Sequence, residues 1–210
     1  MFPVETIVTG LWRENCYVVK GDCGQAIVID PGEDCDPILG FLEAESLTAA
    51  AIINTHAHYD HVGSVADLKA RYCAPFHLHV ADHDLLRQAN FYRKLFGGRR
   101  AITIPDVDVN LADCPRLHLS GIDIMVIHTP GHTPGSVSFL IDGFLFCGDT
   151  IFAKRLGRTD LPGGDRIALC ASVQKLLALP PSTMIFPGHG APVVLADILT
   201  TNAEVAEILA

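Results

Sequence analysis

His56-Ala57-His58-Tyr59-Asp60-His61 is the most informative stretch of this chain, and only Thr55 separates it from the apolar run 49–54. A short continuous apolar run predicts a strand that is buried on both faces. In an extended chain, positions 56 and 58 point to the same side, and a turn into a following helix can carry Asp60 and His61 to a second point of the same cavity. Imidazole and carboxylate are ligands for zinc, iron or manganese, and the stretch holds no thiolate to select a softer metal. It therefore predicts a metal site, with a solvated polar turn as the alternative.

Three further ligand-type residues occur in the second half of the chain. His132 lies in Thr129-Pro130-Gly131-His132-Thr133-Pro134-Gly135, Asp149 follows Cys147-Gly148, and His189 lies in Pro187-Gly188-His189-Gly190. Each stands where a predicted strand gives way to a turn that contains Gly or Pro, a common place for functional groups in α/β folds. One such histidine alone is more often a hydrogen-bonded turn residue. Together with the first stretch, the three residues predict one shared site.

Strands and helices alternate along both halves of the sequence. The predicted strands cover 4–8, 16–19, 26–30, 49–54, 76–80, 116–119, 122–128, 136–141, 144–147 and 184–186. The predicted helices cover 36–44, 62–71, 82–96 with Asp82 as its N-cap, 165–179 and 195–209. This alternation predicts an α/β sandwich of two sheets with helices outside. We expect a single domain over residues 1–210, with 97–115 as the seam between the halves.

Composition limits the classes of protein that this chain can belong to. It has 210 residues, of which 49% are hydrophobic and 19% charged, which excludes a disordered polymer. The net charge is −9, so we expect no nucleic-acid partner. No apolar run approaches the roughly 18 residues of a membrane span, and the first residues lack a basic signal region, so we expect no membrane partner and a cytoplasmic location.

The seven cysteines show no C-x-x-C pair and do not form a recognisable disulfide framework. We therefore expect reduced, mostly buried thiols. Cys147, two residues before Asp149, has no base paired with it by sequence and is interpreted as a core thiol rather than a nucleophile.

These motifs together resemble the metallo-β-lactamase superfamily, from Glu14-Asn15-Cys16-Tyr17 and Ile29-Asp30-Pro31-Gly32 through Pro187-Gly188-His189-Gly190. The resemblance implies a four-layer αββα sandwich of two pseudo-related halves, with a two-metal site between its sheets. It implies that metal one is held by His56, His58 and His132, metal two by Asp60, His61 and His189, and that Asp149 bridges them. The expected cofactors are two divalent metal ions per chain, zinc first, with iron or manganese as alternatives.

Asp149 narrows the activities that the resemblance implies. The best-known β-lactamases of the superfamily lack a bridging aspartate at this place, so lactam hydrolysis is not expected. Hydroxyacylglutathione hydrolases, persulfide dioxygenases, lactonases and tRNA-processing nucleases carry it. The acidic chain lacks the basic extension of the nucleases, and lactonases usually have aspartate where Gly190 stands.

The loop 157–165, with the sequence GRTDLPGGD, is similar to that of compact bacterial glyoxalase II-like hydrolases. Persulfide dioxygenases share its first four residues but typically continue with Phe-Gln. A basic residue at the place of Arg158 lies beside the bound thioester in glyoxalase II, so Arg158 is the expected substrate-binding residue. The alternative is a structural ion pair of Arg158 with Asp160 or Asp165.

The resemblance thus implies a metal-dependent hydrolase of a small thioester such as S-lactoylglutathione, in which Asp60 orients the attacking water. A mononuclear-iron persulfide dioxygenase that uses His56, His132 and either His58 or Asp149 is the main alternative. A lactone hydrolase and a non-enzymatic binding module are the others. We expect no counterpart of the family's glutathione-binding helical domain, and Asp160 and Pro192 stand near the places of its tyrosines.

The remaining histidines are expected to have structural roles. His77 and His79 alternate on one predicted strand face, with His83 beyond, and we expect half-buried packing, a second metal site being the alternative. His118 and His128 are expected to pack or to support the site, and His128 could orient a ligand near His132.

Overall fold

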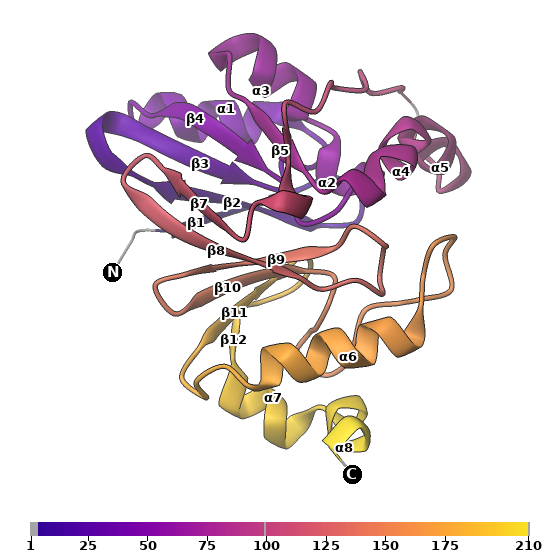
Figure 1. The fold of residues 1–210 in the computed structure, drawn as a ribbon. Helices are drawn as coiled ribbons and strands as arrows, with labels where there is room; N and C mark the ends of the chain where they lie inside the picture. Colours follow the sequence, from indigo (N-terminus) through magenta and orange to yellow (C-terminus); the bar gives the residue numbers. More distant parts are fainter. Residues whose placement is uncertain (1–3, 99, 210) are drawn as a thin grey trace.

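Two six-stranded sheets form the centre of the protein (Figure 1). The computed structural model describes residues 4–98 and 100–209. The first sheet has the order β1-β2-β3-β4-β5-β6 and the second the order β12-β11-β10-β9-β8-β7. Each half of the chain therefore builds one sheet, as the sequence predicts.

The first sheet changes from antiparallel to parallel pairing along its width. It comprises β1 (Val4–Thr9), β2 (Glu14–Lys20), β3 (Gln25–Ile29), β4 (Thr48–Ile53), β5 (Phe76–Leu78) and β6 (Val109–Asn110). The first three strands pair antiparallel, while β3 to β6 pair parallel. The carboxyl ends of the parallel strands meet at one edge, which is where β4 delivers the His56 stretch.

The second sheet is mostly antiparallel. It comprises β7 (Arg116–Leu119), β8 (Ile122–His128), β9 (Val137–Ile141), β10 (Phe144–Gly148), β11 (Met184–Pro187) and β12 (Val193–Val194). Only β10 and β11 pair parallel. Their carboxyl ends lead directly into Asp149 and His189, so these two residues leave the sheet at the same edge.

Helices cover the outer face of each sheet, which gives four layers (Figure 1). The first half contributes α1 (Cys35–Ala44), α2 (Tyr59–Val62), α3 (Val65–Tyr72), α4 (His83–Arg87) and α5 (Ala89–Leu95). The second half contributes α6 (Arg166–Leu177), α7 (Leu195–Thr201) and α8 (Ala203–Leu209). Short 3-10 turns occur at Asp22–Gly24, Val80–Asp82 and Leu111–Asp113.

The alternation of side chains along β2 and β3 explains the layering. Cys16 and Val18 pack under the helices of the first half, while Tyr17 and Val19 face the second sheet. Because successive side chains of a strand point to opposite faces, a strand that is apolar at every position is buried on both. The core between the sheets is continued from the second half by Ile124, Phe139 and other apolar residues. The predicted αββα sandwich is confirmed.

Two predicted helices are interrupted. The segment 82–96 forms α4 and α5, which are separated at Gln88, and the segment 195–209 forms α7 and α8, which are separated at Asn202. Asn202 leaves the helical conformation, and its side-chain oxygen accepts from the backbone N–H groups of Glu204 and Val205. The cap of α8 thus uses the residue that ends α7, which a count of apolar periodicity does not reveal.

The helix predicted over 62–71 starts later, at Val65, because α2 precedes it as a separate turn. Within the described residues of the seam 97–115, β6 and the turn Leu111–Asp113 follow a stretch without regular structure. Among the described residues, no helix is long and apolar enough to cross a membrane.

All seven cysteines are free, as expected, but the prediction that most are buried is wrong. Only Cys16 and Cys147 are buried, and Cys23 and Cys73 are exposed at positions with positive φ. The prediction for Cys147 holds, because it lies in the core under α6 and burial raises the pKa of its thiol to about 12.

Candidate metal centre

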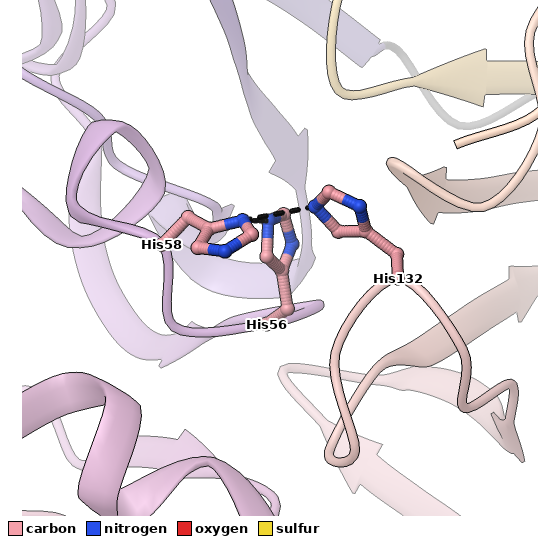
Figure 2. Close-up of side chains that lie close together, drawn as sticks. All are labelled: His56, His58 and His132. Carbon is pink, nitrogen blue, oxygen red and sulfur yellow. Dashed lines mark hydrogen bonds between the residues drawn. The ribbon is translucent and has the colours of Figure 1, made fainter. Parts of the chain in front are cut away.

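Three imidazoles from two loops converge on one point (Figure 2). His56 and His58 lie in the loop after β4, and His132 lies in the loop after β8. The Nδ1 atom of His58 is 3.1 Å from Nε2 of His56 and 2.9 Å from Nε2 of His132. The three ring nitrogens face one another, and no other acceptor of the described residues lies between them. Binding a cation would satisfy them better than contacts with one another do.

A second group lies beside the first and comprises Asp60, His61 and His189. The helix α2 carries Asp60 and His61, so the turn that follows His58 brings them round as the sequence suggests. His189 comes from the loop after β11, and its Nε2 atom is 3.5 Å from Oδ2 of Asp60. In each group the candidate ligand atoms all lie within 4.8 Å of one another.

Asp149 lies between the two groups. Its Oδ2 atom is 3.7 Å from Nε2 of His132 in the first group and 3.6 Å from Nε2 of His189 in the second. Its Oδ1 atom is 3.7 Å from Nε2 of His61. The structure therefore brings together all seven residues that the sequence singles out, with the carboxylate of Asp149 in reach of both groups.

Most of these histidines are oriented by a hydrogen bond on the ring nitrogen that faces away from the site. The Nδ1 atoms of four rings contact Thr55 Oγ1 at 3.0 Å (His56), Asp30 Oδ2 at 3.0 Å (His61), the Arg158 carbonyl at 2.9 Å (His132) and the Trp12 carbonyl at 3.0 Å (His189). Such a contact fixes the ring and leaves Nε2 for a ligand. His58 is the exception, since it presents Nδ1 to the other two rings.

Asp30 is a supporting residue to which the sequence analysis gave no role. It follows β3, and its carboxylate accepts from the backbone N–H of Thr55 at 2.7 Å and from the Thr55 hydroxyl at 2.6 Å. The same carboxylate orients His61, so it ties the end of β3 to the loop after β4. A carboxylate at the end of a buried strand, just before Pro31-Gly32, was the signal that could have revealed it.

Asp82 does not have the role that the sequence predicts. It occupies the N-cap position of α4 but makes no side-chain capping bond. Its fully buried carboxylate instead accepts from the Ala57 N–H at 3.0 Å, the Thr133 hydroxyl at 2.8 Å and the Gly135 N–H at 2.7 Å. Asp82 thus joins the loop of His56 and His58 to the loop of His132.

The surroundings keep His56 and His58 neutral and the carboxylates of Asp60 and Asp149 charged. Burial alone would lower the pKa values of His61 and His189, but hydrogen bonds with Asp30 and Asp60, respectively, outweigh it and raise both. Burial, followed by the neighbouring His132, lowers the pKa of His58 to about 3, and burial with the nearby imidazoles lowers the pKa of His56 well below its ordinary value. Burial alone would raise the pKa of Asp60, but the hydrogen bond with His189 and the nearby His61 outweigh it and lower that pKa. Neutral imidazole and ionised carboxylate are the forms that bind metals.

Two buried atoms at the centre of the site have no hydrogen-bond partner among the described residues, namely Nε2 of His61 and Oδ1 of Asp149. Leaving a buried polar atom unpaired costs about 1–3 kcal/mol, so a protein rarely keeps two of them 3.7 Å apart for structural reasons. A cation between them would satisfy both. The residues present therefore fit the metal ions that the fold implies.

Gly188 is required by close packing at this point. A Cβ atom there would meet Oδ1 of Asp149 and the ring of His61. These are the two residues that carry the buried atoms without partners. The Gly that precedes His189 thus lets the backbone approach the centre of the site.

A cavity of about 300 Å³ opens above the two groups and is bounded below by His58, Asp60, His132, Asp149 and His189. Arg158 lines this cavity, as expected of a substrate-binding residue. Its guanidinium is nevertheless paired with Asp160, through Nε–Oδ1 and Nη2–Oδ2 contacts of 2.7 Å each. The structure thus shows the ion pair that the sequence offered as the alternative.

His77, His79 and His83 belong to none of the potential metal-binding groups found among the described residues. His77 is buried, and its Nδ1 lies 3.1 Å from the Ile52 carbonyl. His79 is also buried and stacks on His128, with ring centres 4.4 Å apart. The contacts of His77 and His79 agree with the expected packing role, although both side chains are buried rather than half-buried and His79 lies one residue beyond β5.

His128 and His118 differ from each other. The Nε2 atom of His128 is 3.0 Å from the carbonyl of Pro134, in the loop that carries His132, which agrees with a supporting role. His118 is exposed and pairs with Asp123 at 2.8 Å, so the prediction that it packs or supports the site is wrong. It lies on β7, far along the sheet order from β10 and β11.

Comparison with known proteins identifies the class to which this fold and site belong. The model of the metallo-beta-lactamase superfamily matches residues 9–189. The chain belongs to this superfamily, whose members are mostly metal-dependent hydrolases.

Individual relatives are similar over almost the whole chain. Hydroxyacylglutathione hydrolase GloC of Haemophilus influenzae is 31% identical over 209 residues, which cover 95% of this chain and 96% of the relative. The crystal structure of BLEG-1 B3 metallo-beta-lactamase has a TM-score of 0.91 at 35% identity, covering 97% of this chain and 99% of that one. The crystal structure of TTHA1623 in a di-iron-bound form has a TM-score of 0.87 at 37% identity, covering 95% and 99%.

Proposed function

We propose that this protein is a dinuclear-metal hydrolase that cleaves a thioester of the S-lactoylglutathione type into a free thiol and a hydroxy acid. One divalent cation is held by His56, His58 and His132 and the other by Asp60, His61 and His189, with Asp149 as the bridge. Zinc is the metal we propose first, and iron or manganese are the alternatives. The proposed catalyst is a single domain that acts in the cytoplasm.

The observation that carries this proposal is the position of Asp149. One of its oxygens lies 3.7 Å from His132 and 3.6 Å from His189, so one carboxylate reaches both groups of donors. A mononuclear site needs three or four ligands and would leave the second group of donors, in which His61 is fully buried, unused. The geometry therefore supports a pair of cations.

Bound at this site, two divalent cations would supply a water whose pKa is lowered from about 15.7 toward about 7 and would polarise a carbonyl oxygen. The side chains of the protein supply orientation. Asp60 faces the cavity and is held against His189, so its carboxylate would accept a hydrogen bond from the attacking water. His61 and His132 are fixed by Asp30 and by the Arg158 carbonyl, so that their free nitrogens keep their positions during turnover.

A thioester makes little demand on a general acid. Among the described residues, carboxylates, imidazoles, arginines, the phenols of Tyr59 and Tyr92 and apolar side chains line the cavity, and no thiol or lysine does. The leaving thiol has an ordinary pKa of about 8.5 and can depart as a thiolate with little protonation. An amide or ether would need a proton at this step.

The relatives support hydrolysis but differ in substrate. GloC, whose name states the proposed activity, is matched over nearly its full length. The similarity to BLEG-1 favours a second candidate, hydrolysis of a β-lactam, which the sequence did not lead us to expect. The di-iron form of TTHA1623 supports two metals per chain, and with them iron as an alternative to zinc.

The test is turnover of three substrates by the metal-loaded protein. We expect hydrolysis of S-lactoylglutathione, little hydrolysis of the β-lactam nitrocefin, and no oxygen consumption with glutathione persulfide. Faster turnover of nitrocefin would favour the lactamase candidate. Oxygen consumption with one iron per chain would favour the persulfide dioxygenase, and turnover of a lactone alone would favour a lactonase.

A further inference from the structure

The walls of the cavity differ in character from the metal-binding groups below. Its apolar lining includes Trp12 from the β1–β2 connection, Tyr92 and Phe96 at α5, and Phe152 and Leu161 from the loops after β10. Trp12 is 50% exposed, while Phe152 is 7% exposed and anchored. Apolar surface of this kind beside a reactive centre binds the non-reacting part of a small substrate.

Two cationic side chains share this wall, and they are not equivalent. Arg158 already directs two of its nitrogens, Nε and Nη2, at the carboxylate of Asp160. Arg155 lines the same cavity and lies over the ring of Phe152, with its guanidinium carbon 4.6 Å from the ring centre. Within residues 4–98 and 100–209, no carboxylate forms an ion pair with Arg155, which leaves its donors for a ligand.

The backbone around Arg155 holds it in place. The N–H of Phe152 donates to the Arg155 carbonyl at 2.9 Å, and Ile151 and Leu156 form a β-bridge across the turn. The N–H of Leu156 donates to Glu204 of α8 at 3.0 Å. This carboxylate does not neutralise Arg155, because it pairs with Arg166 at 2.8 Å. A short closed turn that starts two residues after Asp149 therefore presents a free guanidinium to the cavity.

We propose that Arg155, stacked on Phe152, binds the anionic group of a thioester whose apolar group packs against Trp12, Tyr92 and Phe96. This inference rests on the proposed function and specifies its substrate class. A stacked guanidinium with unused donors forms charge-assisted hydrogen bonds to carboxylate, and the ring beneath it limits the entropy lost on binding. Charge recognition is thereby assigned to Arg155 rather than to Arg158.

The test uses Trp12, the single tryptophan of the chain, as a reporter of occupancy that needs no turnover. The metal-loaded protein is titrated with S-hexylglutathione, an apolar and anionic thioether that cannot be hydrolysed, and with the neutral S-hexyl-N-acetylcysteamine. We expect Arg155→Gln to lower the affinity for S-hexylglutathione about tenfold, which corresponds to about 1.4 kcal/mol of binding free energy. The affinity for the neutral thioether should change less than twofold.

Lys154→Gln is the matched control. It removes the same charge from the neighbouring position of the same turn, but Lys154 does not line the cavity. We expect it to change the affinity for S-hexylglutathione less than twofold, and Arg158→Gln to have a smaller effect than Arg155→Gln. Equal losses of affinity in Lys154→Gln and Arg155→Gln would show that only the overall charge of the protein matters, and would overturn the proposal. A larger loss of affinity in Arg158→Gln than in Arg155→Gln would also overturn it.

This design distinguishes a failure of the binding inference from a failure of the proposed function. If S-lactoylglutathione is hydrolysed and Arg155→Gln leaves the affinity for S-hexylglutathione unchanged, the inference is wrong and the proposed function stands. If no thioester is hydrolysed but binding of the anionic thioether depends on Arg155, the proposed function is wrong and the anion site stands. Absence of saturable binding to the unaltered protein, by fluorescence and by calorimetry, overturns the inference.

Discussion

The floor of the cavity, formed by the two metal-binding groups and Asp149, and its wall, formed by the apolar lining and the two arginines, are built on different principles. On the floor, four of the five imidazoles have a second hydrogen bond that fixes the ring, and supporting carboxylates such as Asp30 and Asp82 are buried. On the wall, Trp12, Arg155 and Arg158 are exposed; Trp12 comes from the β1–β2 connection and both arginines come from the connection between β10 and α6. Several hydrogen bonds therefore hold the side chains of the floor in place, while fewer contacts hold the side chains of the wall. Changes to the floor should therefore alter chemistry and metal binding, and changes to the wall should alter substrate affinity.

The largest expected effect is on the floor, at Asp60. Asp60→Asn removes a negative charge from the second donor group. It also removes the carboxylate that would accept a hydrogen bond from the attacking water. We expect the rate of thioester hydrolysis to fall about 10²–10⁴-fold, since that is the usual contribution of such a group. Steady-state kinetics check this. A rate within twofold of the unaltered protein would show that Asp60 has no such role.

Gly188→Ala tests the close approach of the backbone to the floor. The added Cβ would meet Asp149 and His61, so we expect metal content to fall from two ions to about one per chain, measured by elemental analysis. Gly40→Ala is the control, because a Cβ at that position within α1 meets nothing within 4 Å. It should keep both metals and stabilise the protein by up to about 1 kcal/mol. Full metal occupancy in Gly188→Ala would contradict the packing described.

Asp82→Asn tests the link between the two histidine loops. The carboxylate accepts three hydrogen bonds, and an amide must turn a donor toward at least one N–H or hydroxyl donor. We expect a loss of about 1–3 kcal/mol in the free energy of unfolding, together with weaker binding of the first metal. Denaturant unfolding with and without metal measures both. Asp84→Asn, at an exposed ion pair with Arg87, should change either quantity little, and an equal effect of the two variants would refute the link.

These residues also show how far a sequence can be interpreted. The His56 stretch and its strand were predictable because ligand spacing and strand burial are local properties. His132, Asp149 and His189 were predictable because each follows a strand at a turn. The role of Asp82 was not, because its partners lie 25 to 53 residues away and its position also suits a helix cap. The support of His189 by the Trp12 carbonyl, across 177 residues, leaves no trace in the sequence.

The smallest expected effect is on the wall, at Arg158. A paired guanidinium contributes little to an incoming anion, so Arg158→Ala should raise the KM for S-lactoylglutathione less than threefold and leave kcat nearly unchanged. The small, polar lactoyl group makes little use of the apolar wall, and Arg155 is, among the described residues, the one free guanidinium proposed to bind the anionic group. We therefore expect the KM of the unaltered protein for S-lactoylglutathione to lie near or above 1 mM, the upper end of the common range of about 1 μM–1 mM. Micromolar KM values that rise tenfold in Arg158→Ala would reverse the roles given to the two arginines.

The central claim is that two cations on the floor of the cavity act together on a thioester. It is tested most directly by adding zinc in measured equivalents to metal-free protein and recording the rate of S-lactoylglutathione hydrolysis at each step. The account predicts that activity rises until two equivalents per chain are bound and then levels off. Full activity at one equivalent, or no hydrolysis at any loading with zinc, iron or manganese, would contradict it.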